Sequence, residues 1–459
     1  MQLTPAPAST RSDSRSPRWR TVRHPRSVAA SAVVFVMLSS GCGITATSQA
    51  QDAGTTEAVS VDEGADSDDS QATNTEVADD SVDLFDSSVV HEIEVDFDQD
   101  DYDAMIETFT STGEKDWIAA TVTVDGVVYE DVGLRLKGNS SLFGLTAETA
   151  GNPEALPWLI RFNEFVDGGD HQGYEEIVIR SNSTDTAMNE AVAQQLLDVA
   201  GLASQDPIAT SFIVNDSEAV LRLAVEHPDE EWYEDHFDDE DGLLYKADSE
   251  GDYSFRGDEA EAYTDVFDQK VGDDDLDPLI DFLDFINNAD DMTFADELGD
   301  RLDVEAFATY LAFQDLIGNF DDIDGPGNNS YLQYDTTTGR FTVVSWDLNL
   351  AFDTPNVGGG GGAGRPDGGG AVRPEGPGAG GPGGQSNVLA ERFLADDEFS
   401  ELYDAKTTEL TELLFTNGIA ADLIDTWTQL LVDGAPGLVS EATVESDASA
   451  LTAYVASVS

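Results

Sequence analysis

The apolar residues of the chain alternate with period two over much of its first half and recur with a helical period over most of its second half. Alternation at every second residue predicts strands with one buried face, and recurrence every three to four residues predicts amphipathic helices. Strands are predicted at Val89–Phe97, Ala119–Val124, Val127–Leu136, Trp158–Phe162, Glu176–Arg180, Ser211–Val214, Val220–Val225 and Leu243–Lys246. The turn Asp125-Gly126 joins the second and third of these strands into a hairpin.

Helices are predicted at Met188–Ala200, Leu276–Asn287 and Val304–Ile317, and the helical period returns over residues 387–432. Asp303 is the expected N-cap of the third helix, and Gly201 and Gly318 are the expected ends of the first and third. A hairpin of Tyr331–Tyr334 and Arg340–Trp346 precedes the last helical stretch. Strands come first and helices later, with no parallel strand-helix-strand series, so the predicted fold class is α+β.

Acidic residues dominate the charge of the chain. It has 93 of them against 21 lysines and arginines in 459 residues, a formal net charge of −72. Such acidity excludes the basic patches that bind nucleic acid. Hydrophobic residues make up 40% of the chain, which is enough to bury a core. Two interpretations of the acidity stay open: a protein that works in high salt, and an acidic secreted protein.

The N-terminal segment has the pattern of an export signal. Residues 1–26 contain six arginines, and the short apolar run Ser27–Leu38 leads to Cys42, the only cysteine of the chain. This order resembles a bacterial lipoprotein signal, in which the cysteine becomes the lipidated first residue. We expect residues 1–42 to be a signal peptide and Cys42 to anchor the protein to the cell membrane. Plain secretion and an uncleaved anchor are the alternatives, and all three place the remainder outside the cytoplasm.

Two stretches are poor in large apolar residues. Residues 43–83 consist mainly of Ser, Thr, Ala, Asp and Glu, which predicts a disordered acidic linker. Val357–Gly384 holds 15 glycines in 28 residues and predicts a flexible insert. A phosphate-binding loop is the less favoured reading of the insert, because the strand-to-helix spacing is missing. The folded domain is therefore expected to comprise residues 84–356, with a helical C-terminal part of the same domain at 385–459.

Two of the scarce cations lie close together in the stretch GLRLKGNSS, residues 133–141. Arg135 and Lys137 fall on one face of a predicted strand, because side chains alternate with period two. A pair of cations beside a glycine turn can bind phosphate oxygens. A solvated strand face is the alternative, and the scarcity of cations in this chain shifts the balance toward phosphate binding.

A second stretch, residues 318–352, carries carboxylates and carboxamides around a predicted hairpin. Asp321 and Asn329 lie in the loop before the hairpin, and Asp347 follows it. Apolar residues flank Asp347 on both sides, so its carboxylate is costly to bury unless it is paired or coordinated. Aspartate and asparagine oxygens suit Mg²⁺. Kinases use the same chain order for their base, metal-binding amide and metal-binding carboxylate.

These stretches resemble the CotH (spore-coat protein H) kinase family of atypical secreted protein kinases. The resemblance covers roughly residues 84–356 and more loosely 387–433. It is carried by TVTVDGVVYEDVGLRLKGNSS at 121–141 and above all by LAFQDLIGNFDD and NNSYLQYDTTTGRFTVVSWDLNLAF within Leu311–Phe352. The family implies a kinase-like fold with a strand-rich N-terminal part and a helix-rich C-terminal part. It also implies ATP with Mg²⁺ or Mn²⁺ as cofactors, and a protein substrate that is phosphorylated on its hydroxyl groups.

The resemblance also implies roles for single residues. Asp321 matches the catalytic aspartate of the family. The resemblance implies that the metal ion is bound by Asp347, Asn349 and Asn329, and that ATP is bound by Arg135, Lys137, Glu226 and Lys246. The family commonly has a second acid at the position of Asn349, and it has a glycine before the Glu226 strand that is absent from Asp216–Leu223.

Two classes of function remain after these observations. The first is a secreted, membrane-anchored protein kinase. The second is a catalytically inactive structural or binding protein that is tethered to the envelope and has a kinase-like scaffold. Saturable, Mg²⁺-dependent binding of ATP would separate the two classes.

Replacing Cys42 by alanine tests the predicted anchor. Several acyl chains on one residue hold a protein firmly to a membrane, so Cys42→Ala should move it from the membrane fraction to the soluble fraction. Fractionation with immunoblotting measures the shift, and intact-mass analysis of the wild-type protein is the control. An unmodified wild-type chain that begins at another residue would contradict the lipoprotein interpretation.

Overall fold

The computed structural model describes residues 82–146, 149–248, 253–323, 325, 329–354 and 387–459. All of these residues belong to one compact unit, Glu76–Ser459. The predicted signal peptide with Cys42, the predicted linker apart from its last two residues, and the predicted insert Val357–Gly384 lie outside the described residues.

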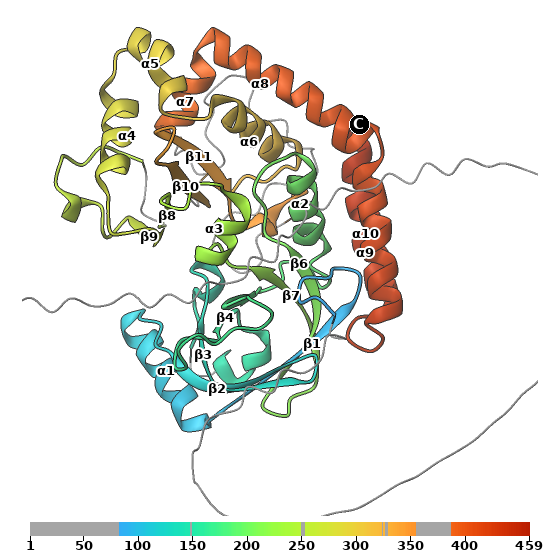
Figure 1. Cartoon of the computed structure of the whole chain (residues 1–459). Helices are drawn as coiled ribbons and strands as arrows, with labels where there is room; N and C mark the ends of the chain where they lie inside the picture. Colours follow the sequence, from blue (N-terminus) through green and yellow to red (C-terminus); the bar gives the residue numbers. More distant parts are fainter. Residues whose placement is uncertain (1–81, 147–148, 249–252, 324, 326–328, 355–386) are drawn as a thin grey trace, which may run out of the picture. The chain divides into compact units, whose positions relative to one another are not determined.

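Seven strands close into a barrel in the order β1-β2-β3-β4-β5-β7-β6 (Figure 1). They are β1 (Val90–Phe97), β2 (Ile118–Val124), β3 (Val127–Leu136), β4 (Trp158–Arg161), β5 (Glu176–Ile179), β6 (Pro207–Val214) and β7 (Val220–Glu226). The predicted hairpin is β2–β3, and its turn residues Asp125 and Gly126 have the positive φ angles, 47° and 84°, that a tight hairpin turn requires. β1 and β6 pair in parallel and thereby close the barrel.

The barrel encloses an apolar core of its own, formed by the inward residues of its alternating strands. Helix α1 (Gln99–Thr112) begins at Asp98, whose side chain caps the first turn. The helix packs Tyr102 against this core, where the ring meets the fully buried Trp158 of β4. The period-two alternation predicted from the sequence therefore corresponds to strands whose inward side chains form the core of a closed barrel.

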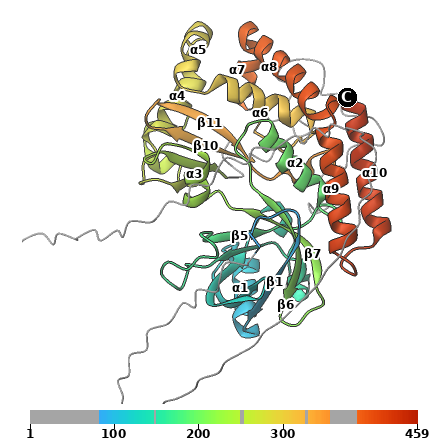
Figure 2. The ribbon, with the colours of Figure 1, turned by 45° about the vertical axis from the view of Figure 1, so that its right-hand side comes forward.

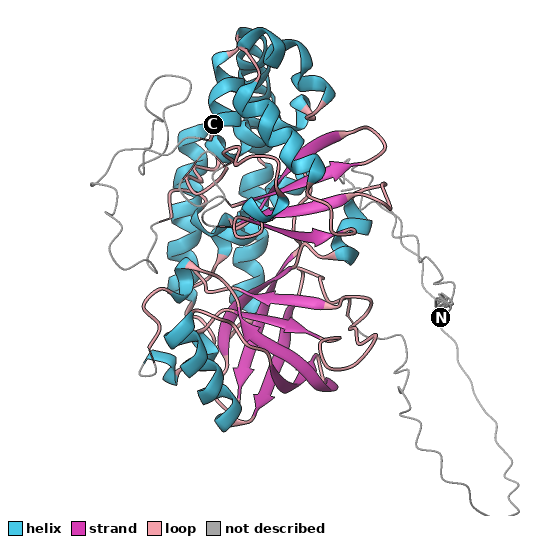
Figure 3. Cartoon of the chain, turned by 90° about the vertical axis from the view of Figure 1, so that its left-hand side faces the viewer, coloured by secondary structure: helices cyan, strands magenta, loops and turns pink. Residues whose placement is uncertain are grey.

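A second, antiparallel sheet has the order β11-β10-β8-β9, and Figure 3 shows it apart from the barrel strands. Its strands are β8 (Leu243–Ala247), β9 (Phe267–Val271), β10 (Ser330–Asp335) and β11 (Arg340–Ser345). Helices α4 (Asp277–Asn288), α6 (Val304–Leu316) and α7 (Val388–Ala395) share one apolar core with this sheet. As predicted, Asp303 caps α6, because its side chain accepts a hydrogen bond from the backbone N–H of Ala306.

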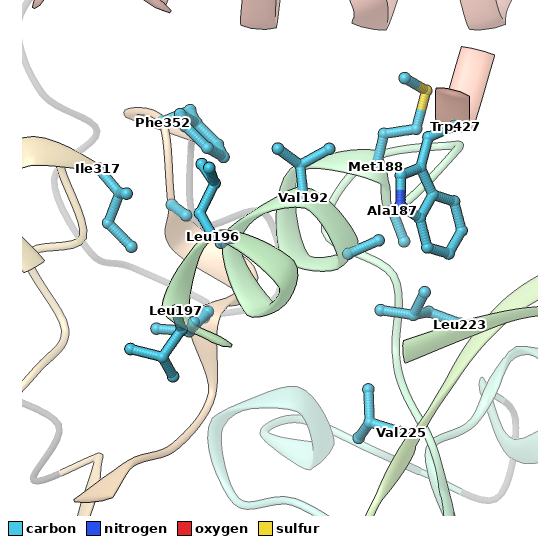
Figure 4. Packing of buried hydrophobic residues seen from close by; sticks show 14 of the residues in the cluster. Ala187, Met188, Val192, Leu196, Leu197, Leu223, Val225, Ile317, Phe352 and Trp427 are labelled. Atoms are coloured by element: carbon cyan, nitrogen blue, oxygen red, sulfur yellow. The ribbon is translucent and has the colours of Figure 1, made fainter. Parts of the chain in front are cut away.

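Helix α2 (Met188–Val199) is buried on most of its surface. Its apolar residues pack with Leu223 of β7 and with Ile317 and Phe352 from the region of the second sheet (Figure 4). On a further side the Trp427 side chain of α9 (Ile419–Gly434) packs into the same core, and its Nε1 donates a hydrogen bond to Gln195 Oε1 (2.9 Å). One helix thus joins the barrel, the second sheet and the C-terminal helices.

The C-terminal part is helical, as predicted. After α7, helix α8 (Asp397–Leu410) continues through a π-helical segment at Thr411–Thr416, and α9 and α10 (Glu441–Val458) follow (Figure 2). Helix α10 lies beyond the predicted helical stretch 387–432. Across the described ranges, no helix is both long enough and apolar enough to cross a membrane.

The predicted fold class is confirmed, since the structure is α+β with its strands mostly N-terminal and its helices mostly C-terminal. The largest difference among the predicted strands is β6, which begins at Pro207 and not at Ser211. The sequence did not predict α1, α3 (Glu230–His236), α5 (Asp291–Glu297), β9 or α10. Several of these are short or strongly acidic, so their apolar period is weak and tertiary contacts decide their structure.

The contact of Trp427 with α2 should be important for stability. Trp427→Ala removes a fully buried ring and its hydrogen bond to Gln195, so the free energy of unfolding should fall by about 3–5 kcal/mol. Met292→Ala on α5 is the control, because Met292 is 73% exposed and its loss should cost less than about 0.5 kcal/mol. Urea unfolding measures both values. Equal effects of the two changes would contradict the central role of α2.

Candidate functional site

Trp346, the residue after β11, lies where the ends of several strands meet. Its ring centroid is 5.3 Å from Lys137 Nζ, 5.5 Å from Arg180 Cζ and 6.1 Å from the His227 ring. Lys137 follows β3, Arg180 follows β5 and His227 follows β7, so all three come from barrel strands. The charged strand ends of the barrel therefore lie beside the residue that immediately precedes Asp347.

Asp347 is held by Arg180. The Nη2 atom of Arg180 pairs with Asp347 Oδ1, and its Nε lies 2.7 Å from Glu190 Oε1 on α2. Burial acts to lower the pKa of Arg180, but Asp347 and Glu190 outweigh it and keep the guanidinium charged. Burial raises the pKa of Glu190 above its usual range, and the negative charge of Asp347 adds to this rise. Asp347 also has a left-handed backbone, with φ 61°, which directs the chain away from the strand.

Asp321 lies near Asp347, although 26 positions separate them in the sequence. Burial, and next the negative charge of Asp347, raise the pKa of Asp321 to about 6. Asn329 Nδ2 donates hydrogen bonds to Asp321 Oδ2 (3.0 Å) and to the Asp321 carbonyl (2.9 Å). The carbonyl of Asn329 in turn accepts a hydrogen bond from the backbone N–H of Trp346 (3.2 Å). The loop after α6 is thereby fastened to the end of β11.

Lys246 of β8 belongs to the same group of charges. Burial lowers the pKa of Lys246 to about 8, and the carboxylates of Asp248, Asp347 and Asp321 oppose this effect. Its Nζ donates a hydrogen bond to the carbonyl of Ala247 (2.7 Å). The sequence predicted Lys246 as an ATP-binding residue, and it stands within electrostatic reach of both predicted functional aspartates.

Lys137 takes part in a second group of charges. Its Nζ lies 2.7 Å from His227 Nε2, and His227 Nδ1 pairs with Glu176 Oε2. Arg161 Nε binds the other carboxylate oxygen of Glu176. Burial, and next the charge of Lys137, lower the pKa of His227 to about 4. Burial acts to raise the pKa of Glu176, but His227 and Arg161 outweigh it and lower that pKa to about 2.

The remaining predicted residues occupy different places. Arg135 Cζ lies 4.6 Å from the centroid of the Trp117 ring, and Arg161 Cζ lies 4.9 Å from the same centroid. Burial lowers the pKa of Lys137, and the charge of Arg135 lowers it further. Asn349 follows Asp347 closely, and its carbonyl accepts a hydrogen bond from the Asn189 side chain (2.6 Å). The Glu226 carboxylate accepts a hydrogen bond from the backbone N–H of Asp206 (2.8 Å), and the next residue, His227, is the one that meets Lys137.

Sequence reasoning missed five residues of this site: Arg161, Glu176, Arg180, Glu190 and His227. Arg135 and Lys137 were selected because cations are scarce in this chain. Arg180, which ends a predicted strand, meets the same criterion and could have been selected as well. No comparable signal identified the two glutamates, because the chain has 93 acidic residues.

Glu176, His227 and Asp229 bring ligand atoms within 4.8 Å of one another. Carboxylate oxygens and a neutral imidazole are suitable ligands for a divalent metal ion. In this group, however, Glu176 already pairs with Arg161, and Lys137 Nζ contacts His227 Nε2. A metal ion would have to displace one of these cations. At the half-buried pair of Asp321 and Asp347 it would likewise compete with Arg180, which pairs with Asp347.

The strand-rich and helix-rich parts, with two aspartates and a lysine between them, define a kinase-like protein. The model of the family described as CotH kinase protein matches residues 134–458, more than half of the chain. The chain belongs to the CotH kinase family, which confirms the resemblance seen in the sequence. Membership of this family suggests the use of ATP and a divalent metal ion.

Other comparisons add little. No curated protein matches the chain. Among solved structures, a chain of the Shewanella oneidensis MR-1 toxin–antitoxin complex of HipA, HipB and operator DNA is similar over 61% of this chain and 57% of that chain, with 12% identity and a TM-score of 0.27. A similarity this low carries no argument about activity or ligands.

Asp229 predicts a pH dependence of stability. Burial, followed by the nearby carboxylates Glu176 and Glu175, raises the pKa of Asp229 to about 7. A raised carboxyl pKa stabilises the fold below the unfolded value near 4 and loses this contribution as pH rises to about 7. Asp229→Asn removes the charge and keeps an oxygen that can accept the capping hydrogen bond from Trp232. It should therefore stabilise the protein at pH 8 by an amount on the order of 1–3 kcal/mol and have little effect at pH 4.5.

Thermal unfolding between pH 4.5 and pH 8 measures this effect, with the exposed neighbour Glu230→Gln as a control for the change in net charge. A stabilisation by Asp229→Asn that is independent of pH, or one that Glu230→Gln reproduces, would contradict the argument.

Proposed function

We propose that the chain is an extracytoplasmic protein kinase, which transfers the γ-phosphoryl group of ATP to hydroxyl groups of a protein substrate with Mg²⁺ or Mn²⁺. The observation that supports this proposal most strongly is the proximity of Asp321 and Asp347. They come from different elements, and each belongs to a network that fixes its position. Membership of the CotH kinase family supports the same conclusion.

Asp347, Asn349 and Asn329 are the proposed metal ligands. The side-chain NH₂ group of Asn329 donates a hydrogen bond to Asp321, which leaves the side-chain oxygen Oδ1 of Asn329 able to bind a cation. A divalent ion beside Asp347 would relieve the repulsion that raises the pKa of Asp321. Bound Mg²⁺ supplies neutralisation and alignment of phosphate oxygens.

Lys137, Arg135 and Lys246 are the proposed phosphate contacts. ATP is strongly anionic and the chain has a net charge of −72, so local cations must offset a repulsive field. The Nε of Arg135 is buried and has no hydrogen-bond partner among the described residues, which is consistent with a donor that awaits an anionic acceptor. The proposed role of Glu226 is indirect, since it supports the strand end that carries His227.

Asp321 is the proposed general base. Its pKa of about 6 lies close to neutral pH, where a carboxylate can still accept a proton efficiently. In the proposed step the substrate oxygen forms a bond to the γ-phosphorus, the bond from that phosphorus to the bridging oxygen of ADP breaks, and the hydroxyl proton passes to Asp321. Positioning and charge neutralisation supply most of the catalysis in such a transfer.

The placement and the partners of the protein are also proposals. A lipid on Cys42 would hold the kinase at the outer side of the cell membrane, where its substrates would be envelope or secreted proteins. The alternative is an inactive scaffold. It is favoured by the ion pair of Arg180 with Asp347 and by Asn349, which supplies no charge at the place of the usual second acid.

Three variants separate catalysis from nucleotide binding. Asp347→Ala should weaken Mg²⁺-dependent ATP binding and abolish phosphoryl transfer, because the metal ligand is lost. Asp321→Ala should leave ATP binding close to intact and lower turnover by about a hundredfold or more. Asn349→Asp should preserve or raise activity, since it restores a charge at the metal site. Calorimetry with Mg²⁺ and ATP measures binding, and transfer of labelled phosphate measures turnover.

Asp296→Ala, an exposed aspartate on α5, is the control and should leave both quantities unchanged. If the wild-type protein transfers no phosphate at any Mg²⁺ or Mn²⁺ concentration and Asp347→Ala does not alter ATP affinity, the inactive scaffold is the better description.

A further inference from the structure

Four charged or polar side chains form a hydrogen-bonded row along one edge of the barrel. Lys137 follows β3, Arg161 ends β4, Glu176 begins β5 and His227 follows β7. The strands β3, β4, β5 and β7 are consecutive neighbours in the barrel. Arg161 lies directly opposite Glu176 in the register of β4 and β5. The Arg161–Glu176 and Glu176–His227 contacts therefore follow from the pairing of neighbouring strands, and the Lys137–His227 contact joins the ends of β3 and β7.

The contacts in this row define the protonation state of the histidine. A lysine ammonium has no acceptor, so the 2.7 Å contact requires that His227 Nε2 accepts a hydrogen bond from Lys137. The proton of the ring then lies on Nδ1, which donates to Glu176 Oε2. Glu176 is held in turn by Arg161 through its other oxygen. His227 is thus a neutral ring that is oriented on both sides.

The burial of these groups is consistent with this arrangement. His227 is 5% exposed, and a pKa lowered to about 4 by burial and by Lys137 keeps its ring neutral near pH 7. Glu176 is also 5% exposed, and His227 with Arg161 keeps its carboxylate ionised despite burial. A buried carboxylate with two fixed partners is well suited to orient a ring.

We propose that His227, oriented by Glu176, is a positioning residue that holds Lys137 for contact with the phosphate oxygens of ATP. The inference deepens the proposed kinase function and rests on it. A lysine that is paired directly with a carboxylate, as in many kinases, shares its charge with that partner. Here a neutral ring fixes Lys137, while the carboxylate charge lies one side chain away and is shared with Arg161. Lys137 keeps two further N–H donors for phosphate oxygens. Burial lowers its pKa well below the usual value, so the negative charge of bound phosphate would favour its charged form.

A divalent metal ion bound by Glu176, His227 and Asp229 is the competing interpretation of the same side chains. In that case His227 would bind the ion through a ring nitrogen that now contacts Lys137 or Glu176. The two interpretations differ in what can replace histidine. Glutamine offers an N–H donor for Glu176 and an oxygen acceptor for Lys137, whereas it is a poor substitute for imidazole as a metal ligand.

The experiment compares His227→Gln with His227→Phe in the full-length protein. Phenylalanine keeps an aromatic ring beside Trp346 and loses both hydrogen bonds. His171→Phe is the control, because His171 is a buried histidine that bonds to Tyr129 away from the row. Three quantities are measured: the KM for ATP with kcat, the rate of Lys137 acetylation by acetic anhydride without nucleotide, and thermal unfolding with Mg²⁺ or Zn²⁺ alone.

His227→Phe should raise the KM for ATP about tenfold or more with a smaller change in kcat, because a hydrogen bond to a charged group is lost. It should also accelerate Lys137 acetylation severalfold, since the amine is released and its charged form is less stabilised. His227→Gln should stay within about threefold of the wild type in both quantities. His171→Phe should alter neither.

Equal KM and acetylation rates for the two His227 variants would overturn the positioning role, as would a His227→Phe variant that matches the wild type. A metal-induced rise in melting temperature that both variants abolish would assign the site to a metal ion and also overturn it. Failure of the wild-type protein to bind ATP would instead reject the proposed function, and the acetylation rates would still report whether His227 holds Lys137.

Discussion

The ion pairs of Arg180 with Glu190 and Asp347 connect three parts of the chain on which the site depends. Arg180 follows β5, Glu190 lies on the buried helix α2, and Asp347 follows β11. Arg180 is 8% exposed and Glu190 is 2% exposed, so neither charge could be buried without a partner. A buried pair of this kind adds little net stability, but the loss of one partner is costly. Its main effect is to specify how the barrel, α2 and the second sheet fit together.

The distribution of charge gives the second constraint. A chain with 21 cations and 93 acids repels anions at long range, and salt screens this field only beyond about 8–10 Å. Arg135, Lys137, Arg161 and Arg180 all come from adjacent barrel strands, and Lys246 comes from the facing sheet. Five cations of this acidic chain therefore come from these strands. Local charge at this place can differ in sign from the net charge of the chain, and this difference favours the proposed binding of ATP.

The two aspartates show how the fold sets different properties for identical side chains. Asp347 pairs with Arg180 and has a left-handed backbone at φ 61°, whereas Asp321 accepts a hydrogen bond from Asn329 and has a raised pKa. One carboxylate is thus fixed by an ion pair, and the other has the raised pKa of a group that exchanges a proton near neutral pH. Such a division of roles is what metal binding and general base catalysis require of a pair of carboxylates.

The sequence by itself determined the elements whose information is local. The hairpin at Asp125-Gly126, the cap at Asp303 and the strand before Asp347 follow from turn chemistry, capping and period-two alternation, and the ordered motifs around Asp321 and Asp347 identified the family. The tertiary structure decided the parallel pairing that closes the barrel and the contacts of Arg180 and His227. His227 and Glu176 are 51 positions apart, and Arg180 and Asp347 are 167 positions apart. Periodicity and propensity describe neighbours along the chain, whereas burial and charge pairing depend on which strand ends the fold brings together.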